Sequence, residues 1–160
     1  MESGIKHITG KSCRRMESLP IWGDLEGYLK EGNTTLSQKY YAGKAYEYES
    51  VSNTHYHYVY AYGQPVAVFI GQNTNFTPYF IHTDHLGSID KITNSSGAIV
   101  NSMSFDAWGN RRQTLYDEHG SQIPGYDTNY LIDRGFTGHQ HLDVFKLINM
   151  GGRVYDPVTA

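Results

Sequence analysis

The sequence predicts a mainly β protein made of antiparallel β-hairpin repeats, with few or no long helices. A short Asp-x-x-Gly pattern occurs in residues 84–87 and again in residues 106–109, each time after an aromatic or β-branched stretch. An Asp side chain accepts from backbone N–H groups two residues on and Gly tolerates positive φ, so each copy predicts a strand that ends in a tight turn. The composition, with 14 Tyr, 17 Gly and 18% charged residues, also favours pleated surfaces and turns.

The strands are expected in order along the chain after a poorly defined lead-in at residues 1–38, which is polar and interrupted by glycines. Apolar or alternating stretches separated by turn residues predict them. A turn at residues 95–97 closes a hairpin between the two Asp-x-x-Gly copies, and this period of about twenty residues is typical of a β-repeat array. The predicted strands cover residues 54–62, 66–70, 79–83, 89–94 and 98–105.

A row of tyrosines alternates along the first of these strands, at Tyr56, Tyr58, Tyr60 and Tyr62. Alternation puts all four rings on one face of a sheet. Such a face packs against neighbouring strands or, if exposed, binds a carbohydrate or a protein partner. Packing is the preferred interpretation.

Two later segments break the pattern. Residues 117–129 are polar, with Gly and Pro, and predict an exposed loop between strands. Residues 142–147 are expected to form a single helical turn with Leu142, Phe145 and Ile148 facing inward.

Four segments in a fixed order identify a resemblance. They are His-Thr-Asp-His-Leu-Gly-Ser at 82–88, Ser-Phe-Asp-Ala-Trp-Gly-Asn at 104–110, Arg-Gly-Phe-Thr-Gly-His at 134–139, and the stretch from Leu147 to Pro157 that ends in Gly-Arg-Val-Tyr-Asp-Pro. In these segments the chain resembles the RHS or YD-repeat family, in particular its RHS repeat-associated core region. The resemblance covers residues 39–157, and 158–160 are a truncated tail. The residues that carry the motifs are Asp84, Gly87, Phe105, Asp106, Trp108, Gly109, Arg134, Gly135, Phe136, Gly138, Arg153, Tyr155, Asp156 and Pro157.

The resemblance implies a spiralling β-sheet that winds into a hollow shell, with the core region closing its C-terminal end. Family members of this kind precede variable C-terminal domains, often toxins, which the shell encloses until delivery. The implied role is structural and non-catalytic. The implied partners are the remaining YD repeats and the toxin domain, and open sheet edges are expected to let the isolated chain associate with itself.

The sequence departs from the family pattern at three positions. Gln140 replaces Glu, Lys146 replaces Gly, and Gly151 replaces Asn. Lys146 puts a long side chain at an expected turn. The sequence also stops at Ala160, where the family continues into a self-cleavage segment and the variable domain, so we expect neither self-cleavage nor toxicity and interpret the chain as a fragment.

Charge and hydropathy argue against two classes of partner. The formal net charge of -3 gives no field that attracts nucleic acid, and no apolar run is long enough for membrane insertion. No signal peptide is recognisable. The resemblance implies a secreted or cell-surface protein, whereas the isolated chain is expected to stay in the cytoplasm.

No catalytic residue and no cofactor is predicted. Asp84, Asp106 and Asp156 each precede Gly or Pro, so turn capping is favoured over acid–base catalysis. The histidine pairs 55/57, 82/85 and 139/141 have spacings compatible with a metal, but structural roles are favoured. Of the three pairs, His139 and His141 are the better metal candidates. The alternatives left open are an adhesion or glycan-binding module with an exposed tyrosine face, and a His-ligated metal hydrolase.

Overall fold

The chain folds almost entirely into β-strands. The computed structural model describes residues 5–9, 12–16, 26–31, 33–112, 130–151 and 153–159. The strands are β1 (Ile5–Thr9), β2 (Ser12–Met16), β3 (Glu26–Glu31), β4 (Thr34–Ala42), β5 (Tyr46–Glu49), β6 (Thr54–Ala61), β7 (Gln64–Gln72), β8 (Asn75–Thr83), β9 (Ile89–Thr93), β10 (Ile99–Ser102), β11 (Gln140–Leu142), β12 (Leu147–Asn149) and β13 (Val154–Tyr155). The short 3₁₀ helix η1 (Phe136–Gly138) is the one helical element in this part of the chain.

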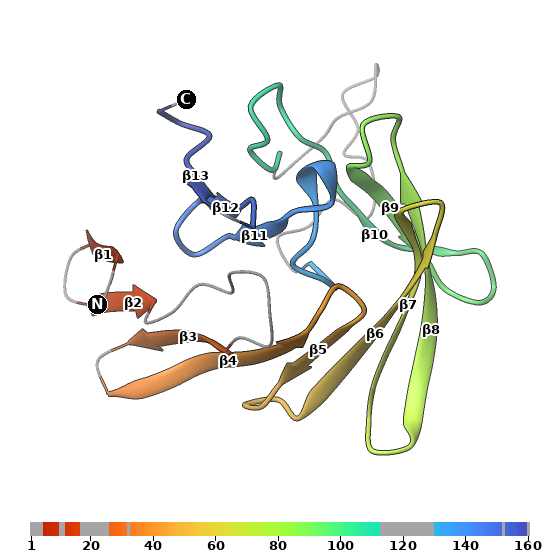
Figure 1. Cartoon of the computed structure of the whole chain (residues 1–160), viewed down its shortest axis with the longest axis horizontal. Coiled ribbons are helices and arrows are strands. Elements are labelled where there is room, and N and C mark those ends of the chain that lie inside the picture. Colours follow the sequence, from red (N-terminus) through yellow and green to blue (C-terminus); the bar gives the residue numbers. More distant parts are fainter. Residues whose placement is uncertain are drawn as a thin grey trace. The chain divides into compact units, whose positions relative to one another are not determined.

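The strands pair in the order in which they occur along the chain. β1 to β10 form a 10-stranded sheet in strict sequence order, and β11 to β13 form a 3-stranded sheet (Figure 1). Each consecutive pair between β1 and β6, and between β8 and β10, is antiparallel. The predicted fold class, mainly β with antiparallel hairpins and without long helices, is confirmed. The spiralling shell remains a prediction.

The chain divides into two compact units. Unit 1 comprises Met1–Tyr58 and Phe69–Thr77, and unit 2 comprises Val59–Val68 and Pro78–Ala160. β6, β7 and β8 each continue from one unit into the other. Among the described residues, no helix is long and apolar enough to cross a membrane.

Unit 1 contains strands where the sequence indicated only a lead-in. β1, β2 and β3 lie within residues 1–38, and the expected boundary at residue 38 falls inside β4. β3 and β4 pair along their length, with a bulge between Leu29 and Lys30. The sequence did not predict these strands, because the segment is polar and lacks a clear alternation of apolar residues.

The predicted four-tyrosine face is not formed. β6 ends at Ala61, and Tyr62 lies in the following turn with φ of 51° and full solvent exposure. Tyr58 is buried, with 5% of its surface exposed. Tyr56 and Tyr60 are half-buried. The hairpin turn at residues 62–63 needs positive φ, and this requirement overrides the alternation at Tyr62.

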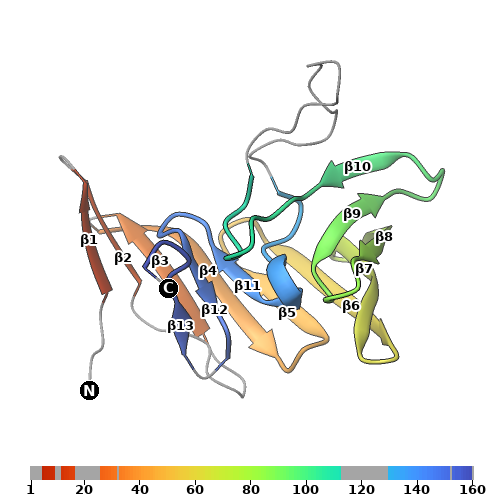
Figure 2. The same ribbon diagram turned by 90° about the horizontal axis from the view of Figure 1, so that it is seen from above.

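Unit 2 contains an aliphatic core. The buried residues that fill it include Ile89 and Ile92 of β9 and Ile148 of β12, together with Met103 and Ile132. β11, β12 and β13 lie side by side, as Figure 2 shows.

The segment 142–147 was predicted wrongly as a helical turn. β11 and β12 form a hairpin that pairs Leu142 with Leu147, and residues 143–146 make its turn. Leu142, Phe145 and Ile148 are all buried, as expected, but a hairpin places them inward. The loop predicted at 117–129 lies outside the described residues.

Candidate functional site

The first Asp-x-x-Gly copy forms a turn closed by its own side chain. Oδ1 of Asp84 accepts from the backbone N–H groups of Leu86, at 2.9 Å, and Ser88, at 2.8 Å. The backbone of Asp84 bonds with Ser88 and Gly87, and Gly87 has φ of 83°. Asp84 therefore has the turn role that its spacing predicts.

The second copy repeats this arrangement. Oδ1 of Asp106 accepts from the N–H groups of Trp108 and Asn110, each at 2.9 Å, and Gly109 has φ of 93°. Burial raises the pKa of Asp106, but hydrogen bonds from the Asn110 side chain and from the backbone outweigh it and lower the pKa overall. The carboxylate is thus held in its charged form by turn donors.

A third copy lies between them, and the Asp-x-x-Gly pattern does not detect it. Oδ1 of Asn94 accepts from the N–H groups of Ser96 and Ala98, each at 3.0 Å, and Gly97 has φ of 81°. An amide oxygen accepts these bonds as a carboxylate does. The repeat is therefore Asp or Asn, two residues, then Gly, and it occurs at 84, 94 and 106.

A fourth turn has the same backbone bonds without a side-chain acceptor. The N–H of Gly135 donates to His139 O at 2.9 Å, the N–H of Gly138 donates to Gly135 O at 3.0 Å, and Gly138 has φ of 72°. This turn contains η1. All four turns therefore share the backbone conformation, and the three turns at 84, 94 and 106 add an Asp or Asn side chain as acceptor.

The two glycines Gly109 and Gly135 make room for aromatic rings. A Cβ at Gly135 would come within 2.8 Å of the Phe105 ring, and one at Gly109 within 2.6 Å of the Phe136 ring. The Phe105 ring lies 5.8 Å from Phe136 and 5.3 Å from His141, measured between centroids. The motif residues of 104–110 and 134–139 therefore form one packed cluster in unit 2.

The first and fourth turns are joined directly. The N–H of Ile89 donates to Gly135 O, and the N–H of Thr137 donates to Ser88 Oγ, each at 3.1 Å. The fold thus brings the segment 82–88 against the segment 134–139, although they are about fifty residues apart in the chain.

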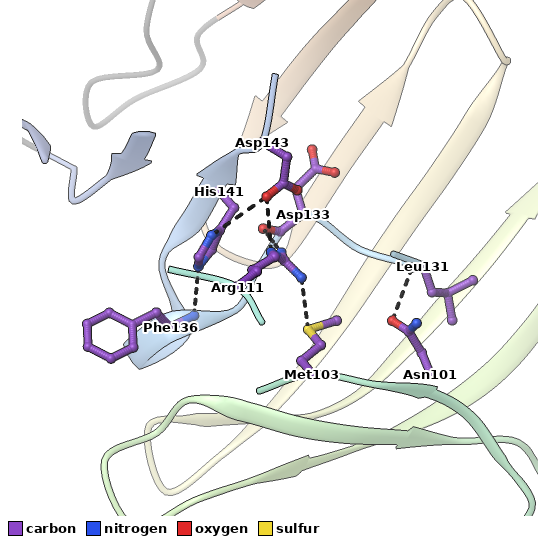
Figure 3. Close-up of polar contacts among 8 residues, drawn as sticks. All are labelled: Asn101, Met103, Arg111, Leu131, Asp133, Phe136, His141 and Asp143. Atoms are coloured by element: carbon purple, nitrogen blue, oxygen red, sulfur yellow. Dashed lines mark hydrogen bonds and ion pairs between the residues drawn. The ribbon is translucent and has the colours of Figure 1, made fainter. Parts of the chain in front are cut away.

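Arg111 is the centre of a polar cluster that links three chain segments (Figure 3). Its guanidinium donates to Met103 Sδ at 3.2 Å and to Asp133 O at 2.9 Å. Its Nε lies 3.2 Å from Asp143 Oδ1, but the N–H is not aligned with that oxygen, so this is a charge contact and not a hydrogen bond. The Tyr130 ring lies 3.8 Å from the guanidinium carbon. The Arg111 side chain is only 6% exposed.

Burial shifts the pKa of three side chains in this cluster, Arg111, Asp143 and His141. It lowers the pKa of Arg111, and the nearby Asp143 opposes that shift. It raises the pKa of Asp143, whose side chain is 44% exposed, against the effect of Arg111. Burial, together with the nearby Arg111 and His139, lowers the pKa of His141 to about 3. His141 is therefore neutral in the folded protein at ordinary pH.

The neutral imidazole of His141 has a structural bond. Its Nε2 accepts from the N–H of Phe136 at 3.0 Å, which assigns the ring proton to Nδ1, 3.8 Å from Asp143 Oδ1. His139 bonds through Nδ1 to the Thr137 hydroxyl at 2.7 Å. The pair that the sequence marked as the better of the three metal candidates is thus engaged in the turn around η1. Within the described ranges, no group of three or more His, Cys, Asp or Glu side chains could hold a metal ion.

The remaining motif residues lie at the edges of unit 2. A guanidinium nitrogen of Arg134 donates to the Tyr60 hydroxyl at 3.0 Å. Trp108 is 56% exposed and Arg153 is exposed. Tyr155 lies in β13 opposite Ile148.

Asp156 and Pro157 begin the last described turn, at residues 157–159. Oδ1 of Asp156 accepts from the N–H of Val158 at 2.9 Å, as the Asp residues of the earlier turns do two residues on. Pro157 is buried, and its carbonyl oxygen lies 3.5 Å from the Asn110 side-chain nitrogen. Asp84, Asp106 and Asp156 therefore each have a turn role and are not paired across a groove.

Among the residues of this cluster, sequence reasoning missed Arg111. No local signal marks its role, because its partners come from residues 103, 130, 133 and 143. Asn94 could have been found by allowing Asn for Asp in the turn pattern. A scan against protein-family models finds no match for this chain, and a search of the curated proteins also finds none.

Proposed function

We propose that this chain is a non-catalytic structural segment of an RHS-type protein, which contributes wall and closing elements to a β-shell around a variable C-terminal domain. The observation that carries the proposal is the pairing of β1 to β10 in strict chain order, with one turn design at residues 84, 94 and 106. A repeat array built this way grows by adding hairpins, and each hairpin makes most of its contacts with the neighbouring hairpins.

The closing role is supported by the arrangement in unit 2. The turn at Gly135 docks on β9 through Ile89 and Ser88. Arg111 joins the end of β10 to the β11–β12 turn through Met103 and Asp143. A segment tied back onto the sheet in this way is the arrangement expected of a terminal, capping element of an array.

The alternatives receive less support. A glycan site on the tyrosine row would need Tyr58, which is 5% exposed. At His139 and His141, where a metal hydrolase would need its ligands, the turn around η1 already uses one ring nitrogen of each residue.

The proposal is tested first by reading the genomic DNA on both sides of the coding frame. We expect an upstream run of Tyr-Asp repeats and a downstream domain unrelated to them. A frame flanked by unrelated genes, with no repeat on either side, would contradict the shell role.

A second test uses the purified chain. β10 is the outermost strand of the large sheet, and Val100 on it is 40% exposed. An unpaired edge promotes association, and a charge placed on it prevents this. We expect concentration-dependent self-association in sedimentation velocity, abolished by Val100→Lys and retained in the control Val144→Lys, whose side chain is 45% exposed in the β11–β12 turn. A chain that stays monomeric at all concentrations would argue against an open edge.

A further inference from the structure

A ladder of aromatic rings crosses one face of unit 1, and the proposed shell role does not use it. Neighbouring rings along the ladder lie 4.6 to 6.0 Å apart between centroids. The ladder crosses β4, β5, β6 and β8. Its members, which we call the aromatic ladder, are Tyr40, Tyr48, His55, Tyr46, His57 and Phe76.

The two histidines of the ladder are successive residues on one face of β6. His55 lies opposite Tyr48, and His57 lies opposite Tyr46. Both imidazoles contact the Tyr46 and Phe76 rings, with centroid distances between 4.9 and 6.4 Å. Residues two apart on a strand are separated by about 6.6 Å, so the two rings project side by side.

The hydrogen bonding of these imidazoles leaves nitrogens for a ligand. Nδ1 of His55 lies 2.7 Å from the Tyr46 hydroxyl oxygen. When that oxygen accepts the Nδ1 proton, the lone pair of Nε2 is left for a metal, which is the usual arrangement of a ligating histidine. His57 is exposed, and neither of its ring nitrogens bonds to any residue in the described part of the chain.

We propose that His55 and His57 form a two-imidazole binding site for a divalent transition-metal ion, with Tyr46 as the positioning residue. Water completes the coordination, since the described residues offer no third histidine, cysteine or carboxylate. Imidazole suits Cu²⁺, Ni²⁺ and Zn²⁺, and Cu²⁺ binds most tightly of these. Metal–nitrogen distances of about 2.0–2.1 Å are reached by rotating the two exposed-face side chains toward each other.

The consequence is a metal-dependent stability of unit 1. An ion that binds the folded ladder and not the unfolded chain stabilises the folded state in proportion to the logarithm of its concentration. This site differs from the pair at 139 and 141, where Nε2 of His141 already accepts from the Phe136 N–H and the buried Arg111 lies nearby.

The test is a titration of the full chain with CuCl₂, NiCl₂ and ZnCl₂ at neutral pH, with MgCl₂ as the negative control. Isothermal titration calorimetry and the Cu²⁺ electron paramagnetic resonance spectrum report the affinity and the number of coordinated nitrogens. We expect one Cu²⁺ per chain with two nitrogen ligands. His57→Ala should weaken binding by about tenfold or more, and Tyr46→Phe, which keeps the ring, by about tenfold.

His85→Ala is the matched control, because His85 is also exposed but has no histidine beside it on a strand face. It should leave the affinity and the spectrum unchanged. Far-UV circular dichroism and the melting temperature without metal show that each variant is folded. Binding that survives His57→Ala with two nitrogens still coordinated, or that falls equally in His85→Ala, would overturn the proposal.

Discussion

The two units bury different kinds of side chain. Among the described residues of unit 1, the buried ones are Glu47, Glu49 and Tyr58. Unit 2 instead buries a set of aliphatic residues that meet from β8, β9 and β12 and from the segments around 103 and 132. Apolar burial is the dominant favourable contribution to folding. Unit 2 therefore has a core of its own, whereas the described part of unit 1 depends on the backbone hydrogen bonds of its sheet, on ring contacts and on polar side-chain bonds.

The polar burial in unit 1 is satisfied by specific donors. Glu49 accepts from the Ser37 hydroxyl and from the backbone N–H groups of Gln38, at 2.9 Å, and Val51, at 3.2 Å. Its carboxylate therefore connects β4 with the turn after β5. A buried carboxylate without such donors would be strongly unfavourable.

The largest effect is expected from Gly109→Ala in unit 2. A Cβ there would meet the Phe136 ring at 2.6 Å and Ile148 at 2.9 Å, and φ is 93°. Gly97→Ala is the control, since it has the same turn conformation and nothing within 4 Å. We expect Gly109→Ala to lower the free energy of unfolding by about 3 kcal/mol or more and Gly97→Ala by about 1 kcal/mol, measured by urea denaturation. Equal losses would mean that the rings do not pack against the turn.

Removing the guanidinium of Arg111 should lower the free energy of unfolding by somewhat less than Gly109→Ala does. Arg111→Met keeps most of the side-chain volume but leaves Asp133 O and Asp143 without their cation. The expected loss is about 2 kcal/mol, below that of a fully buried pair because Asp143 is 44% exposed. Arg112→Met, at an exposed neighbour, should change the free energy of unfolding by less than about 0.5 kcal/mol. Similar losses in both variants would contradict the linking role of Arg111.

Unit 1 can be weakened without disturbing unit 2. Glu49→Ala removes the acceptor for three donors, at a cost of about 1–3 kcal/mol. In hydrogen exchange measured by mass spectrometry, amides of β4 and β5 should lose protection while those of β9 keep it. Loss of protection in β9 as well would show that the two units unfold together.

The free energy of unfolding of unit 2 should depend on pH through His141. Its pKa is about 3 in the folded state and about 6.5 when unfolded. Between these two values the unfolded chain therefore binds more protons than the folded protein. The contribution of His141 to the free energy of unfolding is complete above pH 6.5, and it falls by up to about 1.4 kcal/mol for each pH unit below that value.

Asp143 acts in the opposite direction, because its raised pKa favours the folded state on acidification. His141→Gln should flatten the loss of stability between pH 6.5 and 5, measured by denaturation at each pH. Asp143→Asn should steepen the loss nearer pH 4. An unchanged slope in His141→Gln would mean that the imidazole is not kept neutral by the fold.

The smallest effect is expected at the turn caps. Asp84→Ala removes the acceptor for two backbone N–H groups, and we expect a loss of about 1 kcal/mol. Asp84→Asn keeps the acceptor, as Asn94 does, and should cost a few tenths of a kcal/mol. If both variants lose the same amount in thermal unfolding, the charge matters and not the acceptor geometry.

The sequence predicts the parts of this molecule that local chemistry determines. The strands from β6 to β10, the turns at 84 and 106 and the hairpin between them follow from alternation and from Asp and Gly. Lys146 was expected at a turn, and its φ of 56° places it there with the strain that a positive φ imposes.

The parts that were missed depend on contacts distant in sequence. The hairpin at 140–149 was taken for a helical turn because its three buried residues fit a helical spacing as well as a hairpin. The partners of Arg111 and the neutral state of His141 arise only when segments around 103, 111, 133 and 143 meet in space. Tyr62 was misplaced because the backbone of the turn outweighs the alternation of the strand.

The equivalence of the turns at 84, 94 and 106 has a consequence for how the protein ages. Asparagine side chains slowly hydrolyse to aspartate, and at many positions the new negative charge destabilises the local structure. At Asn94 the product would be the residue that the two sister turns already contain, with its oxygen facing the N–H groups of Ser96 and Ala98. Conversion of Asn94 to ordinary aspartate should therefore leave this turn and its two hydrogen bonds intact.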